Sequence, residues 1–142
     1  MPAGTSFLIS KGMISDTIEK VVFREKEYIA IELRNQLLHA VHPLGWIHEI
    51  NLKINGESIP WKDVYFVVRG QWVCTEFIHT IKDIYWYITE TAYLYVSGLE
   101  LPKGEHLVEF ELVASQIEVS TLLDEKEIWG KRRQTVVQQA TL

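Results

Sequence analysis

The sequence has little of what several protein classes require. A single cysteine, Cys74, excludes an internal disulfide, which small secreted β-proteins commonly contain. Lys and Arg number 14 against 19 Asp and Glu, and the resulting net charge of -5 argues against nucleic acid as a partner. No run approaches about 18 apolar residues, so no membrane span is predicted. Residues 1–13 lack the basic start and apolar run of a signal peptide, so we expect a cytoplasmic protein.

Helical periodicity is also scarce, and one-turn helices are expected only near 75–80 and 122–129. Apolar residues recur instead at every second position, which is typical of half-buried antiparallel strands. Strands are predicted near residues 5–10, 13–23, 28–35, 46–54, 64–73, 84–89, 92–97, 106–119 and 132–141. The pattern predicts one all-β domain over residues 1–142: an antiparallel, jelly-roll-like β-sandwich of about eight to ten strands with little helix.

Turn residues fall between these strands. Asn55-Gly56 is a strong hairpin signal, because both residues tolerate positive φ. Leu101-Pro102-Lys103-Gly104 suits a β-turn in which the proline fixes the second position.

Two neighbouring segments in the second half are aromatic on both faces. Alternation directs Trp86 toward the core and places four tyrosines on the opposite face: Tyr85, Tyr87, Tyr93 and Tyr95. Such a sheet is usually covered on both sides, and 142 residues offer little for a second cover. We therefore predict that these tyrosines contact a partner. The alternative is a core strand whose tyrosine hydroxyls reach solvent at its rim.

Residues 39–49, HAVHPLGWIHE, contain three of the five histidines. His39 and His42 are three apart, so on an extended strand they face opposite sides. A proline and a glycine then bend the chain. His48 is in phase with Ile50, which predicts a half-buried, hydrogen-bonded core histidine.

A metal site on a β-sandwich would be expected to follow the cupin pattern, with a His-x-His pair and a later histidine after a Pro-x-Gly turn. The segment PKGEH imitates the later element by placing His106 after Pro102 and Gly104. However, its spacing is one residue short and no His-x-His occurs. The sequence therefore predicts no metal in this chain, with a small sandwich enzyme holding its own metal as the alternative.

The sequence also offers little support for a nucleophilic or phosphate-binding active site. Cys74 lies among apolar residues, and neither a nucleophile elbow nor a glycine-rich phosphate loop occurs. No catalytic residue is predicted. Five tryptophans could stack on sugar rings, so a stand-alone carbohydrate-binding module stays an alternative: Trp46, Trp61, Trp72, Trp86 and Trp129.

The central stretch IELRNQLLHAVHPLGWIHEINLKINGESIPWKDVYFVVRGQWV resembles the small (beta) subunit of the bacterial C-glycoside deglycosidases. In that family an early strand leads into a Pro-Leu loop, and the next strand ends in an Asn- or Asp-Gly turn before a segment like ESIPWKDVYF. The pieces AYLYVSGLELPKGEHLVEFEL and KRRQTVV resemble its last hairpin and its Arg-containing closing strand. The resemblance covers roughly residues 12 to 140, but the loop HAVHPLGWIHE is richer in His and Trp than the family pattern.

The resemblance implies a function that belongs to a complex. The expected partner is a large TIM-barrel catalytic subunit, with several copies of each chain possible in one hetero-oligomer. That partner is expected to carry the catalytic base and a divalent metal, expected to be manganese, and this chain no cofactor. The implied substrate is a 3-oxo-C-glucoside of a flavonoid or other polyphenol. Its C3 ketone acidifies the C2 proton, so elimination can break the C1–aryl bond.

The same resemblance suggests a role for the loop in this chain. We expect His39, His42 and Trp46 to lie near the substrate, with Trp46 stacking on the aryl ring and His42 hydrogen-bonding a phenol. The alternative is that the loop is only interface or surface.

Overall fold

The computed structural model describes residues 13–35, 41–88, 90–117 and 129–142. Within them the chain forms eleven strands and three short 3-10 helices, so the predicted all-β class is confirmed. The strands are β1 (Ile14–Phe23), β2 (Lys26–Arg34), β3 (Val41–Pro43), β4 (Ile47–Ile54), β5 (Glu57–Ile59), β6 (Val64–Val68), β7 (Gln71–Cys74), β8 (Tyr85–Tyr87), β9 (Thr91–Ser97), β10 (Glu105–Ile117) and β11 (Trp129–Thr141). The helices are η1 (Leu44–Trp46), η2 (Trp61–Asp63) and η3 (Thr75–Thr80).

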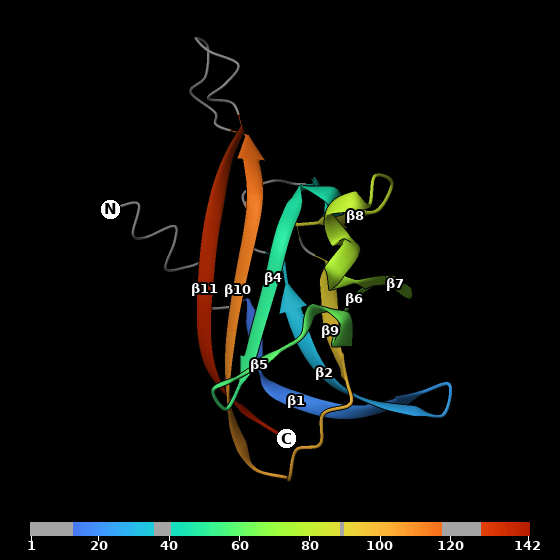
Figure 1. Ribbon diagram of the computed structural model, residues 1–142, viewed down its shortest axis with the longest axis vertical. Coiled ribbons are helices and arrows are strands. Elements are labelled where there is room, and N and C mark those ends of the chain that lie inside the picture. The colour runs from blue at the N-terminus through green and yellow to red at the C-terminus, as the bar shows by residue number, and fades with distance from the viewer. Residues whose placement is uncertain (1–12, 36–40, 89, 118–128) are drawn as a thin grey trace.

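Nine strands form one sheet in the order β5-β4-β10-β11-β1-β2-β9-β6-β7 (Figure 1). Neighbouring strands are antiparallel except β1 and β11, which are parallel and pair at Thr17 and Thr141. The longest ladder joins β10 to β11 in unbroken register from Glu105 opposite Thr141 to the far end of both strands. The two remaining strands, β3 and β8, form a small separate sheet.

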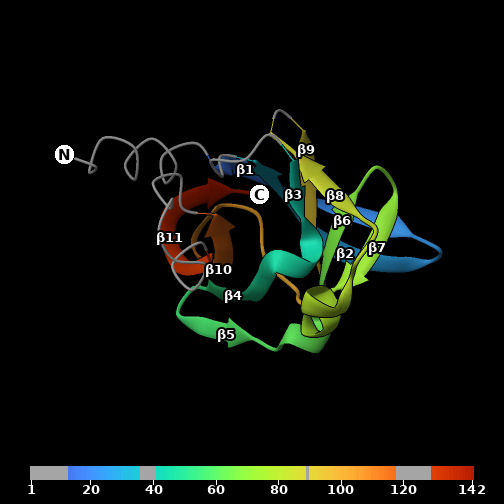
Figure 2. The same ribbon diagram turned by 90° about the horizontal axis from the view of Figure 1, so that it is seen from above.

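Figure 2 shows that the main sheet curls around a common interior. Strands β5, β4, β10 and β11 form one half, and β1, β2, β9, β6 and β7 form the other. The two layers of the expected jelly-roll-like sandwich are thus parts of one sheet, because β1 pairs with both β2 and β11. On the open side, η3 contacts both β4 and β6 and so bridges the two halves.

Alternate residues of facing strands fill this interior. Phe110 of β10 and Phe66 of β6 are fully buried, and each such burial stabilises the fold by roughly 1.5–3 kcal/mol. Trp86 of β8 is also fully buried and packs edge-on against Phe66, with ring centroids 5.1 Å apart. Trp86 therefore anchors the small sheet in the core of the large one.

The turns explain where strands end. Asn55-Gly56 joins β4 to β5 with φ of 53° and 84°, as predicted. Arg69-Gly70 forms a second turn of this kind, with φ of 50° and 75°. The sequence prediction of one strand over 64–73 is therefore wrong. The second turn escapes detection because arginine seldom adopts a positive φ.

Other predicted elements have mixed outcomes. The helical turn expected near 75–80 is confirmed as η3. The expected strand at 5–10 lies outside the described residues, as does 122–128, most of the second expected turn. No helix in the described part of the chain is long and apolar enough to cross a bilayer.

Candidate functional site

The predicted loop from His39 to Trp46 lies only partly within the described ranges, because His39 is outside them. From Val41 onward the chain is regular: β3 pairs with β8, placing His42 opposite Trp86. The helix η1 follows at once. Backbone pairing therefore fixes most of what the sequence presents as a loop.

Gly45 allows η1 to pack against the chain that follows η3. A Cβ atom at Gly45 would lie 2.3 Å from the carbonyl oxygen of Ile81, closer than real Cβ contacts come. Beside it, the Leu44 amide donates to the carbonyl of Ile84 at 3.0 Å. Glycine at this position is thus a requirement of close backbone approach.

His42 is fully buried in the chain. Its Nδ1 lies 3.0 Å from the carbonyl oxygen of Pro43, and a carbonyl only accepts, so Nδ1 is the donor. The ring packs edge-on against Trp46, with centroids 5.7 Å apart. The two residues differ in burial, since His42 is buried and Trp46 is only half-buried.

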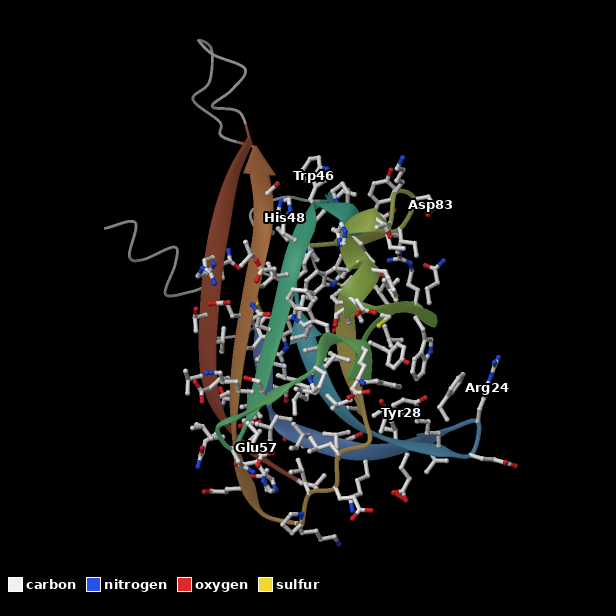
Figure 3. All side chains as sticks on the ribbon, in the orientation of Figure 1. Arg24, Tyr28, Trp46, His48, Glu57 and Asp83 are labelled. Atoms are coloured by element: carbon white, nitrogen blue, oxygen red, sulfur yellow. The ribbon has the colours of Figure 1, made fainter. Side chains whose placement is uncertain are left out.

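His48 lies beside Trp46 at the same end of the molecule (Figure 3). Its Nε2 is 2.6 Å from the Ser115 hydroxyl, so the predicted half-buried, hydrogen-bonded histidine is confirmed. The prediction that His48 lies on the same face of the strand as Ile50 is wrong. The register of β4 against β10 shifts here, and Ile47 is the fully buried residue instead. A β-bulge of this kind cannot be read from alternation alone.

His106 stabilises the fold through hydrogen bonds at both ring nitrogens. Its Nε2 donates to the carbonyl of Pro102 at 2.7 Å, and its Nδ1 accepts from the Asn55 amide at 2.9 Å. The Asn55 side-chain oxygen also accepts from the Leu107 amide at 3.0 Å. The histidine of PKGEH thus ties two turns together. Among the described residues, no group of three His, Cys, Asp or Glu side chains is arranged to hold a metal ion.

The predicted tyrosines divide between two sheets. Tyr85 and Tyr87 lie on β8 and are 38% and 46% exposed. Arg69 holds them from the β6–β7 turn: it forms an ion pair with Glu90, donates to the Tyr85 carbonyl at 2.7 Å and stacks 5.2 Å from the Tyr87 ring centroid.

Tyr93 and Tyr95 lie on β9, where they join a larger aromatic cluster on the outside of the main sheet. We call this cluster the aromatic face: Phe23, Tyr28, Tyr65, Trp72, Tyr93 and Tyr95. Trp72 is its centre, with its ring centroid 4.7 Å from Tyr95 and 5.2 Å from Tyr28. Burial, and then the proximity of Tyr93 and Glu19, raises the pKa of Tyr95 above its ordinary value, so the phenol stays neutral.

The β1–β2 hairpin extends this surface beyond the body of the protein (Figures 1 and 2). Near its tip, Val22 and Phe23 are 69% and 40% exposed, although both are apolar. Exposed apolar side chains gathered in one region mark an interaction surface more often than scattered ones do.

The outside of the other half of the sheet carries a group of linked polar side chains. Here hydrogen bonds and an ion pair link one side chain of η2 to one each of β4, β10 and β11, and we call these four the polar ladder: Trp61, Asn51, Glu111 and Arg133. The indole of Trp61 donates to the Asn51 side-chain oxygen at 2.8 Å, and the Asn51 amide donates to Glu111 at 2.7 Å. Arg133, and then Asn51, hold the pKa of Glu111 below its ordinary value.

Sequence reasoning missed much of both surfaces. Of the aromatic face it identified only Tyr93 and Tyr95, although alternation on 64–73 could have placed Tyr65 outward. It placed Trp86 toward the core, which is confirmed, but it offered all five tryptophans as candidates for sugar stacking. The structure buries Trp86 and encloses Trp72 in the aromatic face, whereas Trp61 is 41% exposed. The side chain of Trp129 lies outside the described part.

Comparison with known families gives one clear result. A family model described as the C-glycoside deglycosidase beta subunit matches residues 15–117. That range runs from the second residue of β1 to the end of β10 and includes the aromatic face and every member of the polar ladder except Arg133. No curated protein matches the chain.

Proposed function

Because the chain belongs to the C-glycoside deglycosidase beta subunit family, we propose that it is the accessory subunit of such an enzyme and docks through its aromatic face. The described chain leaves Phe23 and Tyr93 on this face 40% and 38% exposed. Interfaces are enriched in such aromatic side chains, which combine a large contact area with few rotatable bonds. This uncovered face is the observation that carries the proposal.

The proposed docking area comprises the aromatic face, the projecting hairpin and the two tyrosines of β8. Arg24 at the hairpin tip stacks 5.2 Å from the Phe23 ring and is followed by the exposed Glu25, so the apolar surface has a charged rim. Arg69 likewise places a guanidinium group beside the β8 tyrosines. A hydrophobic centre with a charged rim is the usual anatomy of a subunit interface.

We assign the catalytic machinery to the partner, a large subunit of the TIM-barrel type. The described residues of this chain do not fit a divalent metal, since they bring together no suitable donor set. The proposed metal, manganese, and the base would therefore reside in the large subunit.

The proposed substrate is a 3-oxo-C-glucoside of a polyphenol. A base removes the C2 proton, which the C3 ketone acidifies, and the electron pair forms the C1–C2 double bond. The C1–aryl bond breaks, and the aryl carbon takes a proton. The products are the free aglycone and an unsaturated anhydro-keto sugar.

Trp46 is the residue of this chain that we place nearest the substrate. It lies half-buried at one end of the molecule (Figure 3), and the His42 ring packs edge-on against it. We propose that Trp46 borders the mouth of the partner's active site, and that His42 acts through Trp46 rather than on a phenol directly.

Separate and joint expression tests the proposal. The chain, the proposed large subunit and the pair together would each be assayed for aglycone release from a 3-oxo-C-glucoside. We expect release from the pair, and co-purification of the two chains. Release by this chain alone, or full release by the large subunit alone, would contradict an accessory role.

A further inference from the structure

A second site lies on the outside of the opposite half of the sheet. A groove of about 550 Å³ runs over β4, β10 and β11, beneath the segment that contains β5 and η2. It is lined by Asn51, Leu52, Lys53, Ser58, Ile59, Pro60, Trp61, Glu109, Phe110, Glu111 and Thr135. This volume falls within the usual range for small-molecule sites, roughly 300–1,000 Å³.

Trp61 forms one wall of the groove together with Ile59 and Pro60. Its ring is 41% exposed, yet its orientation is fixed because the indole nitrogen donates to Asn51 at 2.8 Å. The donor is occupied within the protein. The flat ring face is what remains to contact a ligand.

The floor of the groove carries fixed polar groups. Asn51 donates to both Glu49 and Glu111, at 3.1 and 2.7 Å, and Arg133 contacts Glu111 at 2.7 Å from the next strand. These contacts hold the Glu111 carboxylate in place before any ligand arrives. Preorganised polar groups reduce the entropy lost on binding.

Three further side chains line the same floor. Lys53 and Glu109 are directly opposite each other on β4 and β10, and Thr135 is opposite Glu111 on β11. The groove thus combines an ammonium group, two carboxylates, an amide and two hydroxyls with one aromatic wall. An anionic ligand would meet both carboxylates, so phosphate is disfavoured.

We propose that this groove binds a neutral sugar ring. A pyranose has an apolar C–H face that fits the flat face of Trp61, and hydroxyls that both donate and accept, as this floor requires. A planar polyphenol fits less well, since the groove offers one aromatic wall and a polar floor. The proposal concerns this chain alone. The groove lies on the other half of the sheet from the aromatic face, so failed subunit docking would not affect it.

Nuclear magnetic resonance of the nitrogen-15-labelled full chain provides the test. The Trp61 indole N–H signal, identified by its loss in Trp61→Phe, is followed while methyl β-D-glucopyranoside is added into the millimolar range. Phloroglucinol, a phenol without a sugar, is the comparison ligand. We expect a saturable shift of the Trp61 and Asn51 side-chain signals with the glucoside only.

Three variants complete the test, with Asn51 as the reporter where the indole is lost. Trp61→Ala should weaken glucoside binding by about tenfold or more, Trp61→Phe by less, and Trp46→Ala not at all. If Trp61→Ala does not fold, Glu109→Gln replaces it, with a similar loss expected. No saturable shift with the glucoside, an equal shift in Trp61→Ala or Glu109→Gln, or binding of phloroglucinol alone would overturn the proposal.

Discussion

Phe23 stacks on Trp72 with ring centroids 4.7 Å apart, although the two residues come from β1 and β7, the first and last strands of one half of the sheet. Three strands lie between them in the sheet order. The β1–β2 hairpin therefore brings Phe23 to the outer side of the sheet beside Trp72, whose ring also contacts Tyr28 and Tyr95. The aromatic face is a packed structure that still exposes ring surface to solvent.

Trp72→Ala should destabilise the chain, because Trp72 contacts rings from several strands at once. We expect the free energy of unfolding to fall by about 1–3 kcal/mol, less than for a fully buried tryptophan. Urea unfolding followed by circular dichroism measures the difference. Phe23→Ala, at the more exposed edge, should have a smaller effect, and equal effects would argue against a central role for Trp72.

Gly45→Ala should also destabilise the fold, for a different reason. The new methyl group would meet the Ile81 carbonyl oxygen, and backbone cannot move aside as a flexible side chain can. A loss of about 2 kcal/mol or more is expected from this overlap. Thermal unfolding compares it with Val137→Ala on the exposed side of β11, which should change little. An unchanged melting temperature in Gly45→Ala would show that η1 is free to shift.

Two substitutions at Asn55 separate its hydrogen bonds from its backbone conformation. Asn55→Gly keeps the positive φ but loses the bonds to His106 and Leu107, at a cost of about 1–2 kcal/mol. Asn55→Ala should lose roughly 1 kcal/mol more, because alanine disfavours this φ. Equal stabilities for the two variants in urea would contradict this division.

Glu111→Gln should reduce stability in a pH-dependent way. The pKa of Glu111 is lowered in the folded chain, so its stabilisation is present above the ordinary glutamate pKa and is lost as pH falls through the lowered value. Wild type and variant should therefore differ slightly near neutral pH and converge in acid. Denaturant unfolding across this pH range measures the difference. A difference between wild type and variant that stays the same from neutral pH into acid would contradict this assignment.

Much of the fold can be predicted from alternation and turn residues. Ile50 and Leu52 point inward as expected, and Asn55-Gly56 forms the predicted hairpin. The errors arise where tertiary contacts override the local pattern. A bulge at His48 transfers the buried position to Ile47, and Arg69 adopts the φ that glycine would favour.

The two surfaces were harder to predict for another reason. Trp61 and Asn51 are ten residues apart, but Asn51 meets Glu111 only because β4 pairs with β10 in one particular register. Phe23 reaches Trp72 only after four strand pairings are in place. Alternation can place most of these side chains on the outer face of a strand, but which of them meet depends on the order and register of the strands in the sheet.

The most direct test of the central claim is the affinity of this chain for its large subunit, measured with two matched variants. Tyr93 lies on the aromatic face and is 38% exposed, while Leu107 lies on the outside of the opposite half and is 37% exposed. Tyr93→Arg should raise the Kd by about tenfold or more, and Leu107→Arg should leave it unchanged. An unchanged Kd for Tyr93→Arg, or an equal increase for Leu107→Arg, would contradict docking through the aromatic face.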